Sequence, residues 1–244
     1  MLRLIIIVLY LVIYLLVSLP IQLVLFIMSK SQLKKAKEIS LSFVQWGFKC
    51  ILFLTGAKID IRGEENVPTD TPVLYVGNHR SYFDIVITYS RVPRLTGYIA
   101  KKEMTKVPIL SRWMKYLDCL FLDRDDIRQG LQIILTAIDQ VKNGTSMTIY
   151  PEGTRNRTDQ DLIEFHKGSF KIAQKAGCPI IPVVVNNTDD IFEAHPWAIR
   201  PAHVVVEYCK PIYLNELSKE ELKNIDDYVR TIILEKYQAN KSLI

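Results

Sequence analysis

The sequence lacks the features that stabilise small secreted or zinc-binding proteins. Its four cysteines are widely spaced and none forms a Cys-x-x-Cys pair, so neither a disulfide framework nor a zinc site is indicated. A reducing compartment is the simplest inference. The chain also has no Gly-x-Ser-x-Gly sequence, which argues against a nucleophilic serine. It has no internal repeat and no low-complexity linker.

Acidic residues are slightly outnumbered by basic ones, which gives a net charge of +5. This excess favours an anionic partner: nucleic acid, a membrane surface or a phosphorylated substrate. The basic residues are spread along the chain and no nucleic-acid docking motif is present, so we do not expect nucleic acid as a partner. The 244 residues are 49% hydrophobic, which is enough for a sizeable core.

Charged residues are absent from Leu4 to Met28, where Ser18, Pro20 and Gln22 are the interruptions. A helix of this length would reach roughly 37 Å, enough to cross a hydrocarbon core of about 30 Å. The run has no small-residue cleavage site, so we expect a retained membrane segment. Pro20 leaves two shapes open, namely a kinked spanning helix, which we favour slightly, and a helix that enters one leaflet and returns.

Positive charges follow this apolar run more densely than they precede it. Arg3 stands before the run, and four lysines stand just after it at positions 30, 34, 35 and 37. The bias predicts that the rest of the chain lies on the cytoplasmic side. A second, aromatic-rich segment from Leu41 is either an interfacial helix or a helix packed on the core. We therefore expect a membrane anchor over residues 1–56 and an α/β domain over residues 57–244.

Short apolar runs alternate with helical patterns after the anchor. Several runs are continuously apolar, as expected for strands covered on both faces. Helices are predicted over 126–143 and 170–177, and one or two more over 215–237. The fold class is thus α/β, with a mixed, largely parallel central sheet flanked by helices. The predicted strands span 58–61, 73–76, 97–100, 119–122, 147–150, 180–185 and 203–208.

The sequence Asn-His-Arg-Ser-Tyr-Phe-Asp, residues 78–84, follows one of these strands. If the whole stretch were helical, His79 and Asp84 would point about 140° apart. They can meet only if a helix begins between them, and Ser81 is a good N-cap with an acidic residue three positions later. The segment is therefore either a turn with a helix cap, or a general base with its orienting carboxylate. The two interpretations need the same geometry.

Two further segments carry charge at strand ends. In Tyr-Pro-Glu-Gly-Thr-Arg, residues 150–155, Gly153 lets the backbone bend and Arg155 is suited to a phosphate contact. The alternative is a surface turn with an ion pair between Glu152 and an arginine. Residues 101–125 begin with Lys101 and Lys102 and end near Arg124. These three cations either converge on an anion or form a solvated basic face.

Taken in order, these motifs resemble one family. An N-terminal anchor, Asn-His-x4-Asp after a strand, Lys-Lys-Glu followed by Phe-Leu-Asp-Arg, then Pro-Glu-Gly-Thr-Arg and Ile-Pro-Val are similar to the glycerolipid (lysophospholipid) acyltransferases. The resemblance covers roughly residues 58–212. It is closest to the 1-acyl-sn-glycerol-3-phosphate acyltransferases.

The resemblance implies a reaction and its participants. A fatty acyl group would pass from acyl-CoA or acyl carrier protein, as co-substrate, to the free hydroxyl of lysophosphatidic acid, making phosphatidic acid without a covalent acyl-enzyme. No bound cofactor and no metal are expected, and membrane lipids are the other partners. The alternative is an acyltransferase or hydrolase that acts on another lysolipid in membrane remodelling.

The resemblance also implies roles for individual residues. His79 looks like the base that deprotonates the acceptor hydroxyl, with Asp84 as its orienting partner. The substrate-binding residues would be Lys101, Lys102, Arg124, Glu152, Gly153, Thr154 and Arg155. The chain departs from the family in one place. After Lys-Lys-Glu the family often has Pro-x-x-Gly-Trp, whereas here Ser111 replaces the glycine and the tryptophan, Trp113, comes one position later.

Overall fold

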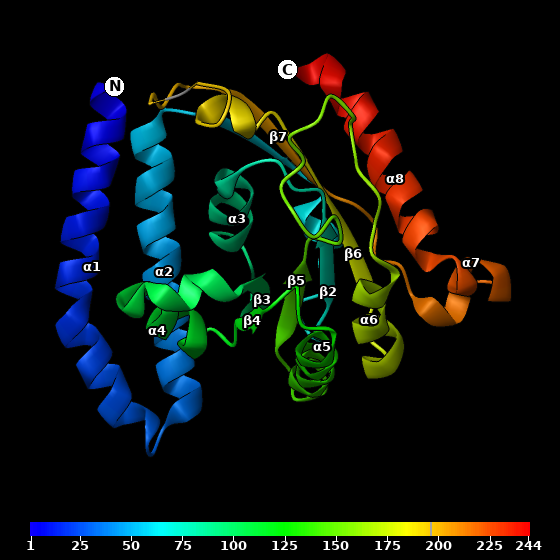
Figure 1. The fold of residues 1–244 in the computed structure, drawn as a ribbon, viewed down its shortest axis with the longest axis horizontal. Coiled ribbons are helices and arrows are strands. Elements are labelled where there is room, and N and C mark those ends of the chain that lie inside the picture. The colour runs from blue at the N-terminus through cyan, green and yellow to red at the C-terminus, as the bar shows by residue number, and fades with distance from the viewer. Residues whose placement is uncertain (196) are drawn as a thin grey trace.

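The computed structural model describes residues 1–195 and 197–244 and is built around one twisted sheet (Figure 1). The seven strands lie in the order β1-β7-β6-β2-β5-β3-β4. Strands β6, β2, β5, β3 and β4 are mutually parallel, whereas β7 pairs antiparallel with β6 and parallel with β1. Their bounds are β1 (Lys58–Arg62), β2 (Leu74–Gly77), β3 (Thr96–Lys101), β4 (Leu120–Leu122), β5 (Ser146–Ile149), β6 (Ile180–Asn186) and β7 (His203–Tyr208).

Helices cover both faces of the sheet, as Figure 1 shows. One core contains residues of α2, α3 and α4, and the other contains residues of α5, α6 and α8. Tyr75 of β2 packs in the first core, and its neighbours Leu74 and Val76 pack in the second. This alternation follows because successive side chains of a strand point to opposite faces of the sheet. The helices are α1 (Leu2–Ser29), α2 (Leu33–Thr55), α3 (Tyr82–Tyr89), α4 (Pro108–Tyr116), α5 (Ile127–Lys142), α6 (Lys171–Ala176), α7 (Lys219–Lys223) and α8 (Ile225–Asn240).

The predicted fold class is confirmed. Each predicted strand is present, with ends that differ by one residue at most, and the predicted helices correspond to α5, α6 and the pair α7 and α8. The sheet is mixed and largely parallel, as expected from continuous apolar strands with helical connections. The N-terminal helical segment ends where α2 ends, at Thr55, and Gly56 takes the left-handed conformation that lets the chain turn into β1.

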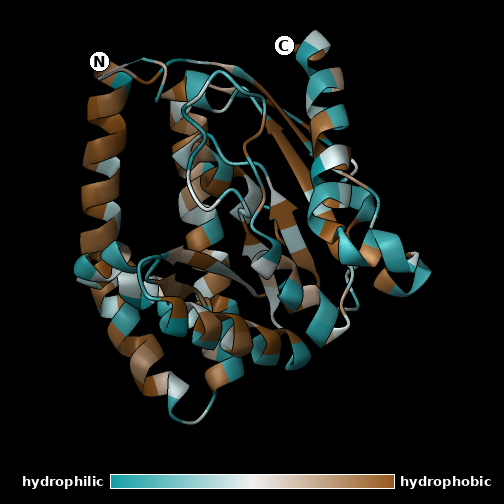
Figure 2. Cartoon of the chain, turned by 45° about the vertical axis from the view of Figure 1, so that its right-hand side comes forward, coloured by the Kyte–Doolittle hydropathy of each residue, from teal (hydrophilic) through white to brown (hydrophobic). Residues whose placement is uncertain are grey.

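The N-terminal segment is a helical hairpin. Helix α1 continues through Pro20 without turning back, and among the described residues it is the one helix long and apolar enough to cross a membrane. Helix α2 runs back along it and packs on α3 and α4. Figure 2 shows apolar residues along nearly all of α1. Trp46 and Phe53 on α2 are also exposed, so α2 has one face on the core and another directed outward.

The two helices of the hairpin fit closely and are tied to the α/β unit. The Tyr14 hydroxyl donates to the carbonyl of Phe43 at 3.1 Å, and a Cβ at Gly47 would come within 2.6 Å of the Tyr14 ring. Trp113 on α4 stacks on the Phe43 ring and donates its indole N–H to the Ser18 hydroxyl at 3.0 Å. The tryptophan that departs from the family spacing therefore joins α4 to both helices of the hairpin.

Candidate active site

The candidate site lies where the parallel strands end, because their carboxyl ends share one edge of the sheet. Strand β2 leads directly into Asn78 and His79. The Asn78 side chain accepts from the Val185 amide and donates to its carbonyl, both at 2.8 Å. This double hydrogen bond fixes the end of β2 against β6 at the point where the chain leaves the sheet.

Helix α3 begins immediately afterwards, and its cap defines the geometry of the pair. Ser81 is the N-cap and its hydroxyl accepts from the Phe83 amide, while Asp84 accepts from the Ser81 amide in a capping box. Nδ1 of His79 lies 2.7 Å from Oδ2 of Asp84. The helix cap and the His–Asp contact are thus one arrangement, as both interpretations of the sequence required.

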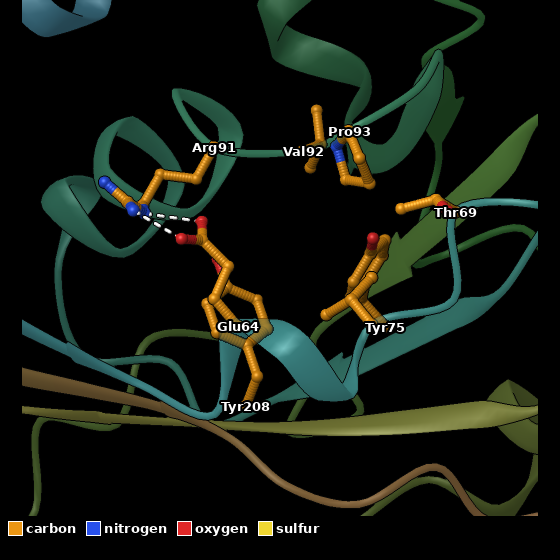
Figure 3. A pocket seen from close by; sticks show the side chains of 8 residues that line it. Glu64, Thr69, Tyr75, Arg91, Val92, Pro93 and Tyr208 are labelled. Atoms are coloured by element: carbon orange, nitrogen blue, oxygen red, sulfur yellow. Dashed lines mark hydrogen bonds and ion pairs between the residues drawn. The ribbon is translucent and has the colours of Figure 1, made fainter.

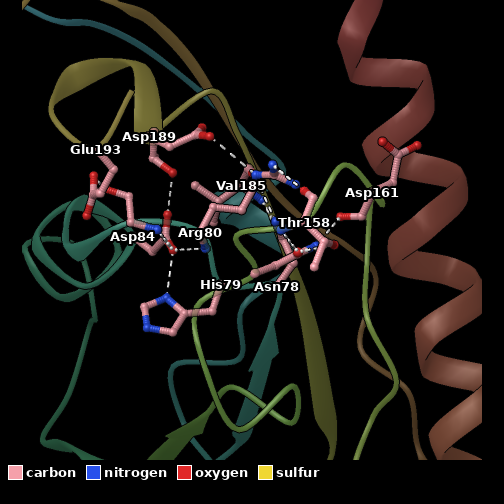
Figure 4. Close-up of polar contacts among 12 residues, drawn as sticks. Asn78, His79, Arg80, Asp84, Thr158, Asp161, Val185, Asp189 and Glu193 are labelled. Atoms are coloured by element: carbon pink, nitrogen blue, oxygen red, sulfur yellow. Dashed lines mark hydrogen bonds and ion pairs between the residues drawn. The ribbon is translucent and has the colours of Figure 1, made fainter. Parts of the chain in front are cut away.

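Asp84 is completely buried, and it is surrounded by donors (Figure 4). Its Oδ2 accepts from His79 and from the amides of Arg80 and Ser81, both at 2.8 Å. Its Oδ1 accepts from the hydroxyl of Thr188. A buried carboxylate is stable only when such donors replace its water. With Nδ1 engaged, Nε2 of His79 has no hydrogen-bond partner among the described residues.

The backbone and ring of His79 are fixed from the other side by residues around the end of β5. The His79 ring stacks on Tyr150 with 4.2 Å between centroids. Its amide donates to Oε1 of Glu152 at 2.8 Å, and its carbonyl accepts from the Asn156 amide at 2.6 Å. The loop after β5 therefore positions the histidine, and the two sequence motifs are parts of one site.

Glu152 is buried and holds two backbone amides. Besides His79, its carboxylate accepts from the Ile163 amide at 3.3 Å. Desolvation by burial raises the pKa of Glu152 to about 7, although these two amides act in the opposite direction. A buried carboxylate near Asp84 is not placed to attract phosphate. Its contacts are those of a residue that orders the His79 loop.

Arg155 lies beside the N-terminus of α3. Its guanidinium carbon is 3.8 Å from the centroid of the Tyr82 ring, and Nη2 donates to the Tyr82 hydroxyl at 3.2 Å. Nη1 donates to Oε1 of Glu193 at 3.0 Å. The ion pair expected at this turn therefore involves Arg155 and Glu193, and Glu152 takes no part in it. Gly153 has a φ of 68° and precedes Thr154, which is exposed.

The three cations at the ends of β3 and β4 are arranged differently. Lys101, Lys102 and Arg124 are all exposed. Lys102 donates to Asp123 at 2.5 Å, and this contact raises the pKa of Lys102 and lowers that of Asp123. Within the described residues, no hydrogen bond or ion pair involves the side chain of Lys101 or Arg124. These cations share the carboxyl edge with His79, but the structure does not fix them around a common centre.

Sequence reasoning missed the segment after β6, which provides three contacts to the site. Thr188 donates to Asp84, Asp189 pairs with Arg80 at 3.4 Å, and Glu193 accepts from the Ser81 hydroxyl at 2.7 Å. Arg80 also donates to the carbonyls of Thr158 and Gln160. Two aspartates after a strand resemble an ordinary loop, and only the pairing of β6 with β2 brings them to His79.

A cavity of about 170 Å³ lies on the face of the sheet that α3 covers (Figure 3). The buried hydroxyls of Tyr75 and Tyr208 have no partner among the described residues. A narrower hollow shares Tyr75, Val92 and Tyr208 with it and reaches Tyr150, the residue under the His79 ring. No group of acidic, histidine or cysteine residues suited to a metal ion occurs in residues 1–195 and 197–244.

Comparison with known proteins identifies relatives of this chain. A family model described as Acyltransferase matches residues 58–186. The chain is 31% identical to the 1-acyl-sn-glycerol-3-phosphate acyltransferase of Borreliella burgdorferi, over 79% of this chain and 77% of that protein. It is 30% identical to the enzyme of the same name from Saccharomyces cerevisiae, over 72% of this chain and 59% of the yeast protein.

A solved structure gives the same result for the fold. The crystal structure of the 1-acyl-sn-glycerophosphate acyltransferase PlsC from Thermotoga maritima superimposes with a TM-score of 0.78 at 24% identity. The match covers 98% of this chain and 97% of that one, so it includes the helical hairpin as well as the sheet. Because the family model spans more than half of the chain and its relatives match over most of it, this protein belongs to the acyltransferase family.

Proposed function

We propose that this acyltransferase moves a fatty acyl group from an acyl thioester to the free hydroxyl of 1-acyl-sn-glycerol-3-phosphate, making phosphatidic acid. The relatives named for this activity support the acceptor. The observation that carries the mechanism is the 2.7 Å contact between Nδ1 of His79 and the buried Asp84. This contact leaves Nε2 as the nitrogen available to an acceptor hydroxyl.

The proposed reaction proceeds in one transfer. Asp84 keeps the proton on Nδ1, so Nε2 of neutral His79 takes the proton of the acceptor hydroxyl as its oxygen attacks the thioester carbonyl. The carbon–oxygen bond forms, the carbon–sulfur bond breaks, and the leaving thiolate recovers the proton from the imidazolium. Asp84 stabilises that imidazolium, the role that a carboxylate has in a Ser–His–Asp triad. The substrate supplies the nucleophile, and no cofactor takes part.

Arg155 is the proposed phosphate contact. A guanidinium offers a planar fork of N–H donors that suits a phosphomonoester, and Arg155 is fixed beside the helix that carries Asp84. Gly153 and Thr154 shape the same turn, and Glu152 orders it. Lys101, Lys102 and Arg124 are proposed to add a diffuse positive field for the anionic substrates, since their side chains are exposed.

The hairpin supports a location on one leaflet of a membrane, and the lysines that follow the apolar run favour its cytoplasmic side. Protein contacts run along α1 from Arg3, beside Gly56, to Gln22, which donates to the Ile109 carbonyl. That distance is about 28 Å along the helix, close to the thickness of a hydrocarbon core. A spanning α1 would carry α2 and α4 into the bilayer with their lysines, so we propose instead that the whole α1–α2 hairpin, which turns at residues 30–32 and not at Pro20, lies in one leaflet. Amphiphilic substrates would then reach His79 laterally.

The purified protein in vesicles, supplied with radiolabelled acyl-CoA or acyl carrier protein with and without 1-acyl-sn-glycerol-3-phosphate, tests the proposal. Labelled phosphatidic acid should form only when acceptor is present, with at least one of the donors. The variant His79→Ala should remain folded and inactive. Release of free fatty acid without acceptor would identify a hydrolase instead, and faster labelling of another lysolipid would reassign the acceptor.

A further inference from the structure

Glu193 lies outside every motif and outside the matched region 58–186, yet its carboxylate contacts three residues of the site. Its Oε2 accepts from the Ser81 hydroxyl at 2.7 Å. Its Oε1 accepts from the Tyr82 amide at 2.9 Å and from Nη1 of Arg155 at 3.0 Å. One carboxylate therefore caps α3, the helix that carries Asp84, and holds the arginine beside it.

Arg155 is restrained by Glu193 and Tyr82 together. Its guanidinium lies over the Tyr82 ring and donates to the Tyr82 hydroxyl. The side chains of Arg155 and Glu193 are 17% and 19% exposed, so the ion pair is partly shielded from water. A guanidinium has five N–H donors, and these contacts use one on each terminal nitrogen. Within the part of the chain that the structure describes, no hydrogen bond uses the remaining donors, so they can bind a ligand.

We infer that Glu193 is a positioning residue for acceptor recognition: it fixes the guanidinium of Arg155 so that its free donors face the acceptor phosphate. A free arginine side chain would lose rotamer freedom when it binds the phosphate. The ion pair with Glu193 and the stacking on Tyr82 already restrict the side chain before the phosphate binds. Less entropy is then lost on binding, which favours it. Because Glu193 also caps α3, it holds the Arg155 guanidinium at a fixed position relative to the His79–Asp84 pair. The inference rests on the proposed role of Arg155.

The variant Glu193→Gln tests it, because glutamine keeps the size of the side chain and can still accept from the start of α3. Its neutral amide holds Arg155 less firmly. We expect the KM for 1-acyl-sn-glycerol-3-phosphate to rise about tenfold, the order expected when one charge-assisted hydrogen bond is weakened. The kcat should stay within about threefold. Tyr82→Phe removes the other hydrogen bond to Arg155 and should raise KM in the same direction by a smaller factor.

A double-mutant cycle separates this role from a purely structural one. In an Arg155→Ala background, Glu193→Gln should change the acceptor KM by less than about twofold, because the group that Glu193 positions is gone. Glu207→Gln is the matched control, since Glu207 is 16% exposed and paired with Lys236 away from the site. It should leave both constants unchanged.

Several outcomes would overturn the inference. A lower KM in Glu193→Gln would mean that the carboxylate competes with phosphate. A fall in kcat at constant KM, or an equal effect in the Arg155→Ala background, would mean that it acts through α3 alone. If Glu193→Gln unfolds, Glu193→Asp takes its place in the cycle, because aspartate keeps the charge but is one methylene too short to keep the 3.0 Å contact with Arg155. If Arg155→Ala itself leaves the acceptor KM unchanged, Arg155 does not bind the phosphate. That result would contradict the proposed function of Arg155, whereas the outcomes above contradict only the positioning role of Glu193.

Discussion

Two regions of the same sheet edge carry charged motifs, but they are built differently. At the ends of β2, β5 and β6, Asp84 and Glu152 are buried and each accepts from backbone amides. At the ends of β3 and β4, Lys102 and Asp123 form an ion pair in which the lysine side chain is 49% exposed. In the first region hydrogen bonds fix the positions of the charged side chains, whereas in the second the charged side chains are exposed and few contacts hold them.

The position of the strands in the sheet accounts for this difference. Strand β2 lies between β6 and β5, so loops from both sides cover the residues that follow it. Strand β4 is at the edge of the sheet and has a neighbour on one side only. Exposed ion pairs contribute little and are screened by salt. We therefore expect substitutions in the first region to act on chemistry and those in the second to act weakly.

Asp84→Asn should have the largest effect, and Asp123→Asn is its counterpart in the second region. Asparagine keeps the size of the side chain but no longer stabilises the imidazolium or selects the His79 tautomer. The kcat should fall by roughly 10²- to 10⁴-fold, against less than about threefold for Asp123→Asn. Steady-state kinetics with a thermal-unfolding check measures this. Similar losses in the two variants would remove the distinction between the regions.

Arg155→Lys and Arg124→Lys compare the two arginines at the edge. Lysine keeps the charge but loses the planar fork and the stacking on Tyr82. We expect the acceptor KM to rise about 10- to 50-fold for Arg155→Lys, the size of one or two charge-assisted hydrogen bonds. Arg124→Lys should change it less than about threefold. Equal changes would indicate that acceptor binding depends on net charge alone.

Thr188→Val probes the support of Asp84 from the segment after β6. Valine has nearly the same shape but cannot donate to Oδ1 of Asp84. One buried hydrogen bond to a charged group is worth about 1.5–3 kcal/mol. We expect only part of this energy to be lost from the transition state, so kcat should fall about 5- to 20-fold. Thr188→Ser should restore most of the rate. A serine variant as slow as the valine one would show that packing matters and the hydroxyl does not.

The stability of the two regions should depend on pH with opposite sign. Burial raises the pKa of Glu152 from its usual 4.5 to about 7, so between these values the folded state binds more protons than the unfolded state. Its contribution is present below pH 4.5 and lost as the pH rises to about 7. At about 1.4 kcal/mol per pKa unit, the total is about 3 kcal/mol.

Urea unfolding at a series of pH values measures this contribution. Glu152→Gln does not titrate, so its unfolding free energy should lack the decline between pH 4.5 and 7. Lys102 lowers the pKa of Asp123, so that exposed pair stabilises the fold above the unfolded pKa of Asp123 and loses its effect as the pH falls. An unchanged slope in Glu152→Gln would mean that another group causes the decline.

Much of the site could be predicted because its signals are local. A serine at position 81, three residues before Asp84, predicts a capping box, and this cap places Asp84 against His79. The loop 150–155 follows a strand, so its place at the sheet edge could also be predicted. Thr188 and Glu193 could not, since they meet the motif across more than 100 residues of sequence. Their own surroundings in the sequence resemble an ordinary loop.

By itself the sequence determined the strands, the apolar N-terminal helix and the His–Asp geometry. Each depends on the spacing of residues close together in the chain. Only the tertiary structure decided which cations are fixed and which are free, and that Arg155 pairs with Glu193 while Glu152 is buried under His79. It also decided that α1 lies along α2. The physical reason is that burial and pairing depend on which strands become neighbours, and no local pattern encodes that order.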